Sequence, residues 1–102
     1  MQRQPTHPGE LLKEDVLPAM QLSIAKAADL IGVTRQYLGD VANAKKPMSM
    51  SLCYKIGKLA GNGPDLWANM QTAYDLWQAK QDKTLQDNLK SIPTFDMISA
   101  NR

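Results

Sequence analysis

A short polar stretch, GVTRQYLGDVANAKKP at positions 32–47, carries residue types that read the edges of DNA bases. The candidate base-reading residues are Arg35, Gln36, Tyr37 and Asp40. Arg pairs with the O6 and N7 acceptors of guanine, and Gln pairs with the N6 and N7 edge of adenine. The tyrosine is placed for a thymine methyl group or the DNA backbone, and the aspartate for a cytosine amino group or for excluding wrong sites. This stretch therefore predicts sequence recognition in a major groove.

Positive charge gathers around the same stretch. Residues 23–58 carry six basic and two acidic side chains, whereas the whole chain of 102 residues carries 12 and 10. Lys45 and Lys46, together with the exposed amides near Asn43, are placed for phosphates, which give affinity without reading sequence. The alternative, ordinary solvated lysines on helix surfaces, stays open on charge alone.

Apolar residues recur at spacings of three and four, which predicts helices, and no alternating pattern persists for the length of a strand. The expected helices lie at about 8–17, 23–31, 34–43, 49–60 and 64–80. Glu10 is expected to reach back to the amides near His7, and Pro18 to end the first helix. Ser23, Thr34 and Ser49 are expected N-caps. The predicted fold is all-α, a five-helix repressor-like domain with a C-terminal extension.

The second and third helices have the pattern of a helix-turn-helix, at about 23–43. Gly32 suits the tight turn because it tolerates positive φ. The small Ala28 lets the two helices approach closely, and Val33, Leu38 and Val41 fall where the pair must pack on each other and on the domain. The bland alternative is a solvated surface helix in a bundle that has no DNA partner.

An aromatic stripe marks the last predicted helix: Trp67, Met70, Tyr74 and Trp77 follow at spacings of three, four and three. The stripe is core in one interpretation and a dimer seam in another, since a two-fold DNA site needs two recognition helices held about 34 Å apart. A cofactor pocket is a distant third, and no cofactor is predicted. The domain is expected to span 1–80, with 64–80 as its dimerisation helix, and 81–102 to be a tail that is partly disordered or binds a partner.

Other chemistry finds little support in the composition. A single Cys53 in an apolar pattern excludes an intramolecular disulfide and predicts a buried filler, and one His and one Cys make no metal motif. No base, carboxylate pair or phosphate loop accompanies the serines, so an enzyme is not expected. No apolar run spans a membrane or resembles a signal peptide, which predicts a cytoplasmic protein with no membrane partner.

Over about residues 7–80 the chain resembles the HigA-type antitoxins, a branch of the XRE-like, phage-repressor-related helix-turn-helix proteins. The opening HPGELLKEDVL and the ending PDLWANMQTAYDLWQAK carry the resemblance more specifically than the helix-turn-helix does. The resemblance implies a homodimer that binds an inverted repeat in its own promoter. It also implies neutralisation of a small basic HigB toxin, a RelE-like ribonuclease that cuts messenger RNA on the ribosome. A stand-alone XRE-like repressor without a toxin is the alternative, and a purely protein-binding helical module is a third.

The resemblance also assigns residues. It places base contacts at Arg35, Gln36 and Asp40, and backbone contacts near Ser23, Thr34, Asn43 and Lys45. It turns Trp67 and Met70 inward and leaves Tyr74 and Trp77 partly in a subunit interface. Two departures from the family stand in the third helix region: Gly39 replaces a polar residue, and Ala44 replaces the usual Gly, so the chain is expected to leave this helix differently.

Overall fold

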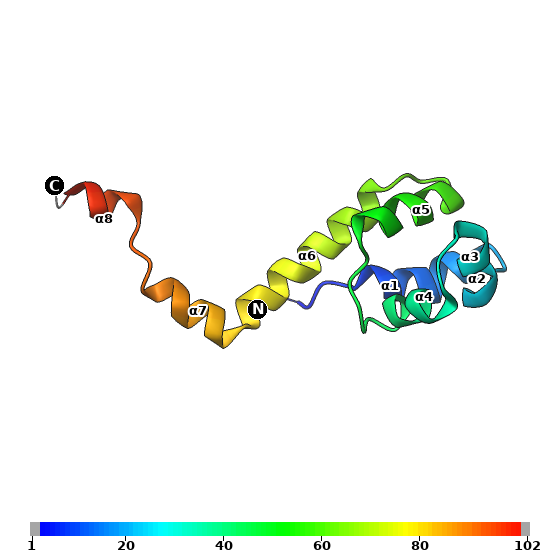
Figure 1. The fold of residues 1–102 in the computed structure, drawn as a ribbon, viewed down its shortest axis with the longest axis horizontal. Helices are drawn as coiled ribbons and strands as arrows, with labels where there is room; N and C mark the ends of the chain where they lie inside the picture. The colour runs from blue at the N-terminus through cyan, green and yellow to red at the C-terminus, as the bar shows by residue number, and fades with distance from the viewer. Residues whose placement is uncertain (1–2, 101–102) are drawn as a thin grey trace.

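Every regular element in residues 3–100, the part that the computed structural model describes, is a helix (Figure 1). The elements are α1 (Pro8–Leu11), the π-helical turn η1 (Leu12–Val16), α2 (Leu17–Ala19), α3 (Ile24–Ile31), α4 (Arg35–Ala42), α5 (Met50–Ala60), α6 (Asp65–Gln81), α7 (Lys83–Lys90) and α8 (Phe95–Ala100). The first three are consecutive segments of one helix. The predicted all-α fold with a repressor-like arrangement of five helices is confirmed, and α7 and α8 follow it.

The sequence predicted that the first helix ends at Pro18, and this prediction is wrong. The helix passes through the proline and ends at Ala19, because η1 changes the hydrogen-bond pattern one turn earlier. The N–H of Leu17 donates to the carbonyl of Leu12, five residues back, and both leucines are buried. In the left-handed conformation, with φ of 56°, Gln21 then turns the chain.

The start of this helix differs from the prediction as well. The imidazole of His7, not Glu10, caps it, because Nδ1 accepts the N–H of Gly9 at 2.9 Å. A Cβ built on Gly9 would stand 2.6 Å from the carbonyl carbon of Val41 and overlap its oxygen. The first turn of α1 therefore lies directly against the backbone of α4, and only glycine permits that approach.

One hydrophobic core unites the helices α1 to α6. Its buried members are Leu12, Leu17, Ala27, Ala28, Leu38, Val41, Met48, Leu52, Cys53, Ile56 and Trp67. Trp67 is fully buried and its indole N–H donates to the side-chain oxygen of Asn62 at 3.2 Å. Burial raises the pKa of the Cys53 thiol, as expected for a buried filler.

The described part of the tail forms two helices that the sequence did not predict. Asp82 caps α7 by accepting the N–H of Leu85 at 3.1 Å, and Pro93 separates α7 from α8. None of the residues of α7 and α8 is buried. Figure 1 shows α6 leading from the core at one end of the molecule toward these helices at the other. The longest dimension of the molecule is 62 Å. Among residues 3–100, no helix combines the length and apolar character that a membrane span requires.

Candidate nucleic-acid interface

The turn between α3 and α4 has the geometry that the helix-turn-helix pattern predicted. Gly32 is left-handed with φ of 74°, and the carbonyl of the fully buried Ala28 accepts the N–H groups of Gly32 and Val33 at 2.9 and 3.1 Å. Leu38 and Val41 are fully buried on the inner face of α4. The outer face of α4 is therefore left to polar side chains that the packing does not use.

Two of the residues predicted to meet phosphates are the N-caps of the motif. The hydroxyl of Ser23 accepts the N–H of Lys26 at 3.0 Å, and that of Thr34 accepts the N–H of Tyr37 at 3.1 Å. Each cap uses its oxygen as an acceptor and leaves the hydroxyl hydrogen able to donate. Both predicted caps, like the cap of α5 at Ser49, are confirmed.

Arg35 is the first residue of α4, and its exposed guanidinium pairs with a residue that the sequence did not single out. Its Nη2 and Nε lie 3.0 and 3.4 Å from the two carboxylate oxygens of Asp29, near the end of α3. This hydrogen-bonded pair lowers the pKa of Asp29 and raises the pKa of Arg35. Both side chains are more than half exposed, so the pair contributes little stability and instead restricts where the guanidinium points.

Asp40 ties together two other predicted contact residues. Its Oδ1 accepts from Gln36 Nε2 at 3.0 Å, and its Oδ2 lies 3.5 Å from Lys46 Nζ. The side chain of Asp40 is only 17% exposed, so both of its oxygens are turned toward the chain's own donors. With one amide hydrogen held by Asp40, Gln36 keeps its carbonyl oxygen and its second amide hydrogen for another partner.

Tyr37, one of the predicted base-reading residues, is half-buried beside the outer face of α4. Its ring packs against the core, and its hydroxyl donates to Ser49 Oγ at 3.2 Å. The side chain thus links α4 to the start of α5. Of the four predicted base-reading residues, Arg35 and Gln36 are exposed at the beginning of α4, whereas Tyr37 and Asp40 are only partly accessible.

At the other end of α4 the backbone makes a left-handed turn of the kind that glycine favours at a helix end. Ala44 has φ of 60°, its N–H donates to the Val41 carbonyl at 3.0 Å, and the N–H of Lys45 donates to the Asp40 carbonyl at 2.8 Å. These two hydrogen bonds together form a Schellman motif. Ala44 thus adopts the left-handed conformation that glycine favours, and the expectation that the chain leaves this helix differently from its family stays a prediction.

Asn43, the residue before this turn, is held by its neighbours. Its amide donates to the carbonyl of Gly39 at 3.0 Å, and its Oδ1 accepts from Lys13 Nζ at 2.8 Å. Lys13, which the sequence did not single out, thus brings a cation from the first helix to the end of α4. Together with the exposed Lys45 and Lys46, it makes this end of α4 positively charged.

Relatives identify the family. No protein-family model matches the chain. An HTH-type transcriptional regulator of Haemophilus influenzae, itself uncharacterized, is 30% identical over 92 residues, which cover 90% of this chain and 86% of that protein. Antitoxin HigA-1 of Vibrio cholerae is 31% identical over 78 residues, or 76% of this chain and 73% of the antitoxin. The chain belongs to the HigA-type antitoxins of the XRE-like helix-turn-helix family.

A solved structure shares the fold over most of the chain. The structure of the Pseudomonas aeruginosa antitoxin HigA with the higBA promoter superposes with a TM-score of 0.78 at 24% identity, and covers 89% of this chain and 98% of that one. This structural match, like the 92-residue sequence match to the Haemophilus influenzae regulator, is longer than residues 7–80, so the likeness to relatives reaches into the tail.

The aromatic stripe of this HigA-type chain divides between core and surface. Trp67 is buried, whereas Tyr74 and Trp77 are partly exposed, with ring centroids 6.2 Å apart. The edge-to-face contact of Tyr74 with His7, at 4.9 Å, ties the outer part of α6 to the start of α1. Leu76, which the sequence did not single out, is 61% exposed and lines a shallow pocket together with Trp77, so it extends this apolar surface. Residues 3–100 hold no group of His, Cys, Asp or Glu side chains placed to share a metal ion.

Proposed function

We propose that the chain is a DNA-binding autorepressor whose α4 enters the major groove of an inverted-repeat operator in its own promoter. The observation that carries the proposal is the exposure of Arg35 and Gln36 in the first turn of α4, behind a left-handed Gly32 and a capping Thr34. Residues at this end of a recognition helix contact base edges. In support, the Pseudomonas aeruginosa HigA, which shares this fold, was solved with a promoter.

In this proposal the two exposed residues read different bases. Arg35 donates two hydrogen bonds to the O6 and N7 of a guanine, and Gln36 accepts from adenine N6 while its second amide hydrogen donates to N7. Asp40 orients Gln36 through the bond at 3.0 Å and contacts a cytosine amino group only where a base comes close enough. Tyr37 borders the groove and contacts the DNA backbone or a thymine methyl group.

The backbone contacts come from both ends of the motif. Ser23 and Thr34 donate their hydroxyl hydrogens to phosphates. Phosphates at the other end of α4 are contacted by Lys45, Lys46 and the amides near Asn43. These contacts set the register of α4 and supply the salt-dependent part of the affinity. The two copies of the motif that an inverted repeat needs are joined in a homodimer through the partly exposed Tyr74 and Trp77 on α6.

The antitoxin activity is the second half of the proposal: the chain binds and neutralises a small basic HigB-type toxin that cleaves messenger RNA. Membership of the HigA-type family supports it. The alternative is a stand-alone XRE-like repressor without a toxin, which the regulator name of the Haemophilus influenzae relative favours. Co-expression with a short basic reading frame next to the gene separates the two, because only an antitoxin restores growth that the neighbour's product arrests.

DNA binding is tested by an electrophoretic shift of the gene's own upstream region, titrated at several salt concentrations. The expected result is a specific complex that weakens steeply between about 50 and 200 mM salt. The double variant Arg35→Ala with Gln36→Ala removes both proposed readers and leaves the buried face of α4 intact. A shift of equal affinity by this variant rules out the proposed mode of recognition.

A further inference from the structure

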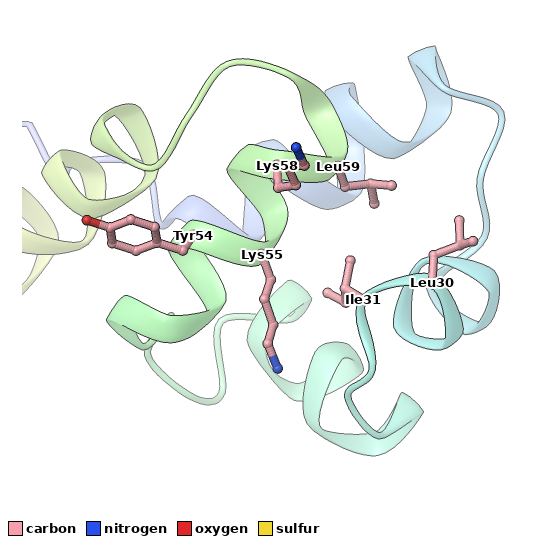
Figure 2. Close-up of a pocket in the computed structure, with 6 residues that line it drawn as sticks. All are labelled: Leu30, Ile31, Tyr54, Lys55, Lys58 and Leu59. Atoms are coloured by element: carbon pink, nitrogen blue, oxygen red, sulfur yellow. The ribbon is translucent and has the colours of Figure 1, made fainter.

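An apolar groove lies between the end of α3 and α5, away from the outer face of α4. Its lining residues are Leu30, Ile31, Tyr54, Lys55, Lys58 and Leu59, and its volume is about 320 Å³. Figure 2 shows Leu30 and Ile31 on α3 beside Lys55 and Leu59 of α5, with Tyr54 farther along α5. Leu30 and Tyr54 are 54% and 61% exposed, so this groove presents an apolar surface that the core does not cover.

The end of the described chain presents a complementary surface. In α8, Phe95 is 74% exposed, Met97 59% and Ile98 48%, and Asp96 lies among them. A single helix of six residues is marginal in water, because too few hydrogen bonds offset the cost of its first turn. This helix therefore needs a surface on which its apolar residues pack.

We propose that α8 of one copy docks in the α3/α5 groove of a second copy of this chain. The apolar residues of α8 meet an apolar lining, and the charges are complementary: Asp96 is acidic, whereas Lys55 and Lys58 border the groove. Within residues 3–100 none of these three charges has an ion pair of its own. Docking brings them together at the edge of the contact, where they favour one orientation of the helix.

The shape of the molecule favours a second copy over the chain's own groove. Figure 1 shows α3 at one end and α8 at the other, with α6, 17 residues or about 25 Å of helix, between them. Two copies placed antiparallel along α6 bring each tail beside the core of the other. The exchange is then reciprocal and forms a closed two-fold dimer. This step rests on the proposed dimer contact of α6 and not on DNA binding.

Disulfide trapping between two separately labelled chains tests the contact. One chain carries Tyr54→Cys and the other Phe95→Cys, both in a Cys53→Ala background. Mild oxidation of the mixture is expected to give a disulfide-linked heterodimer. The control pair, Glu14→Cys with Phe95→Cys, places the first thiol on an exposed position of the first helix outside the groove. A yield no greater than that of the control overturns the proposal. The proposal is also overturned if a single chain carrying both cysteines forms the disulfide within one monomer while the mixture of singly substituted chains forms none.

Charge reversal gives a second measurement that does not depend on oxidation. Asp96→Lys should raise the dimer dissociation constant about tenfold, since an attraction becomes a repulsion, and Lys55→Glu with Lys58→Glu should restore it. If sedimentation equilibrium gives Asp96→Lys the same dimer dissociation constant as the parent chain, the proposed docking is overturned, even if α8 binds a toxin or another surface. Electrophoretic shifts of the operator with the same variants separate the docking proposal from the proposed DNA binding. If Asp96→Lys still binds the operator, the proposed function stands, because only the Arg35 and Gln36 variants test it.

Discussion

Replacing Gly9 by Ala is expected to destabilise the fold, although alanine is the better helix former. In an open helical position the change contributes about 0.5–1 kcal/mol of stability, because glycine loses more freedom on folding. At Gly9 the new Cβ would lie 2.6 Å from the carbonyl carbon of Val41 and overlap its oxygen. Side-chain Cβ atoms do not approach that closely, so the first turn of α1 must move away from α4. Such forced displacement costs about 1–3 kcal/mol, so after the gain in helix propensity we expect a net loss of roughly 1 kcal/mol.

Gly39→Ala is the matched control, because a Cβ at Gly39 meets nothing within 4 Å. The same substitution should therefore raise the free energy of unfolding by about 0.5–1 kcal/mol there. Urea unfolding followed by circular dichroism measures both changes, and an unchanged m-value shows that only stability has changed. In thermal melts the melting temperatures of the two variants should fall on opposite sides of that of the parent chain, with Gly9→Ala lower by roughly 5 °C.

The reasoning fails if Gly9→Ala is as stable as the parent chain or more stable, because the close contact with α4 would then not constrain the backbone. A smaller loss accompanied by weaker operator binding carries separate information. It would show that α1 yields by tilting α4, whose carbonyl at Val41 is the contact, and so connects the HPGE opening to the DNA-binding surface.

Three further predictions concern pH, backbone strain and DNA contacts. Burial lowers the pKa of His7 below 6.5, so the free energy of unfolding should fall as pH drops from about 6.5 through that lowered pKa, because protonation removes the Nδ1 acceptor that caps α1. In His7→Asn this slope should flatten; equal slopes contradict the assignment. Ala44→Gly should raise stability by about 0.5 kcal/mol, since a left-handed alanine costs roughly 1 kcal/mol and the added freedom of the unfolded chain offsets part of it; a lower urea midpoint counts against this. Arg35→Ala should cost about 1–3 kcal/mol on the operator and relax specificity at one base pair, whereas Lys45→Ala should weaken all sequences alike and reduce the salt slope by about one. Titrations on operators substituted at single positions separate these two patterns, and indistinguishable losses across them would refute both roles.

Signals that act within a few residues could be predicted from the sequence. The caps at Ser23, Thr34 and Ser49 and the turn at Gly32 each involve a backbone group no more than four residues away, and all four are present. The five helices of the domain follow from apolar periodicity, whereas the burial of Trp67 was implied by the family resemblance.

Contacts between elements were harder to predict. Asp29 and Arg35 are on different helices, and their pairing depends on how the turn aims the two side chains. The sequence gives both residues but no orientation. The two helices of the tail were missed for another reason: they are short and none of their residues is buried, so although Leu85 and Leu89 have helical spacing, the sequence shows no packed core that would fix them.

Ala44 shows why a departure from a family pattern does not decide a backbone. The sequence indicates that alanine disfavours a left-handed turn, but not how strongly the surrounding bonds enforce it. In the structure two hydrogen bonds, from Ala44 and Lys45 to carbonyls of α4, hold the turn despite the alanine. Local preference here yields to the hydrogen bonds of the helix end.

The π-helical turn at 12–16 makes the first helix tolerant of a change in length. Leu12 and Leu17 are five residues apart and both are buried, although an unbroken α-helix brings residues three or four apart to one face. Deleting one of the exposed residues 13–15 would place the two leucines four apart and restore the ordinary helical spacing, with the core unchanged. Chains of this fold can therefore differ by one residue at this point and still superpose on either side of it. Sequence comparisons across the HPGE opening should allow a single gap there rather than shift the helix by one position.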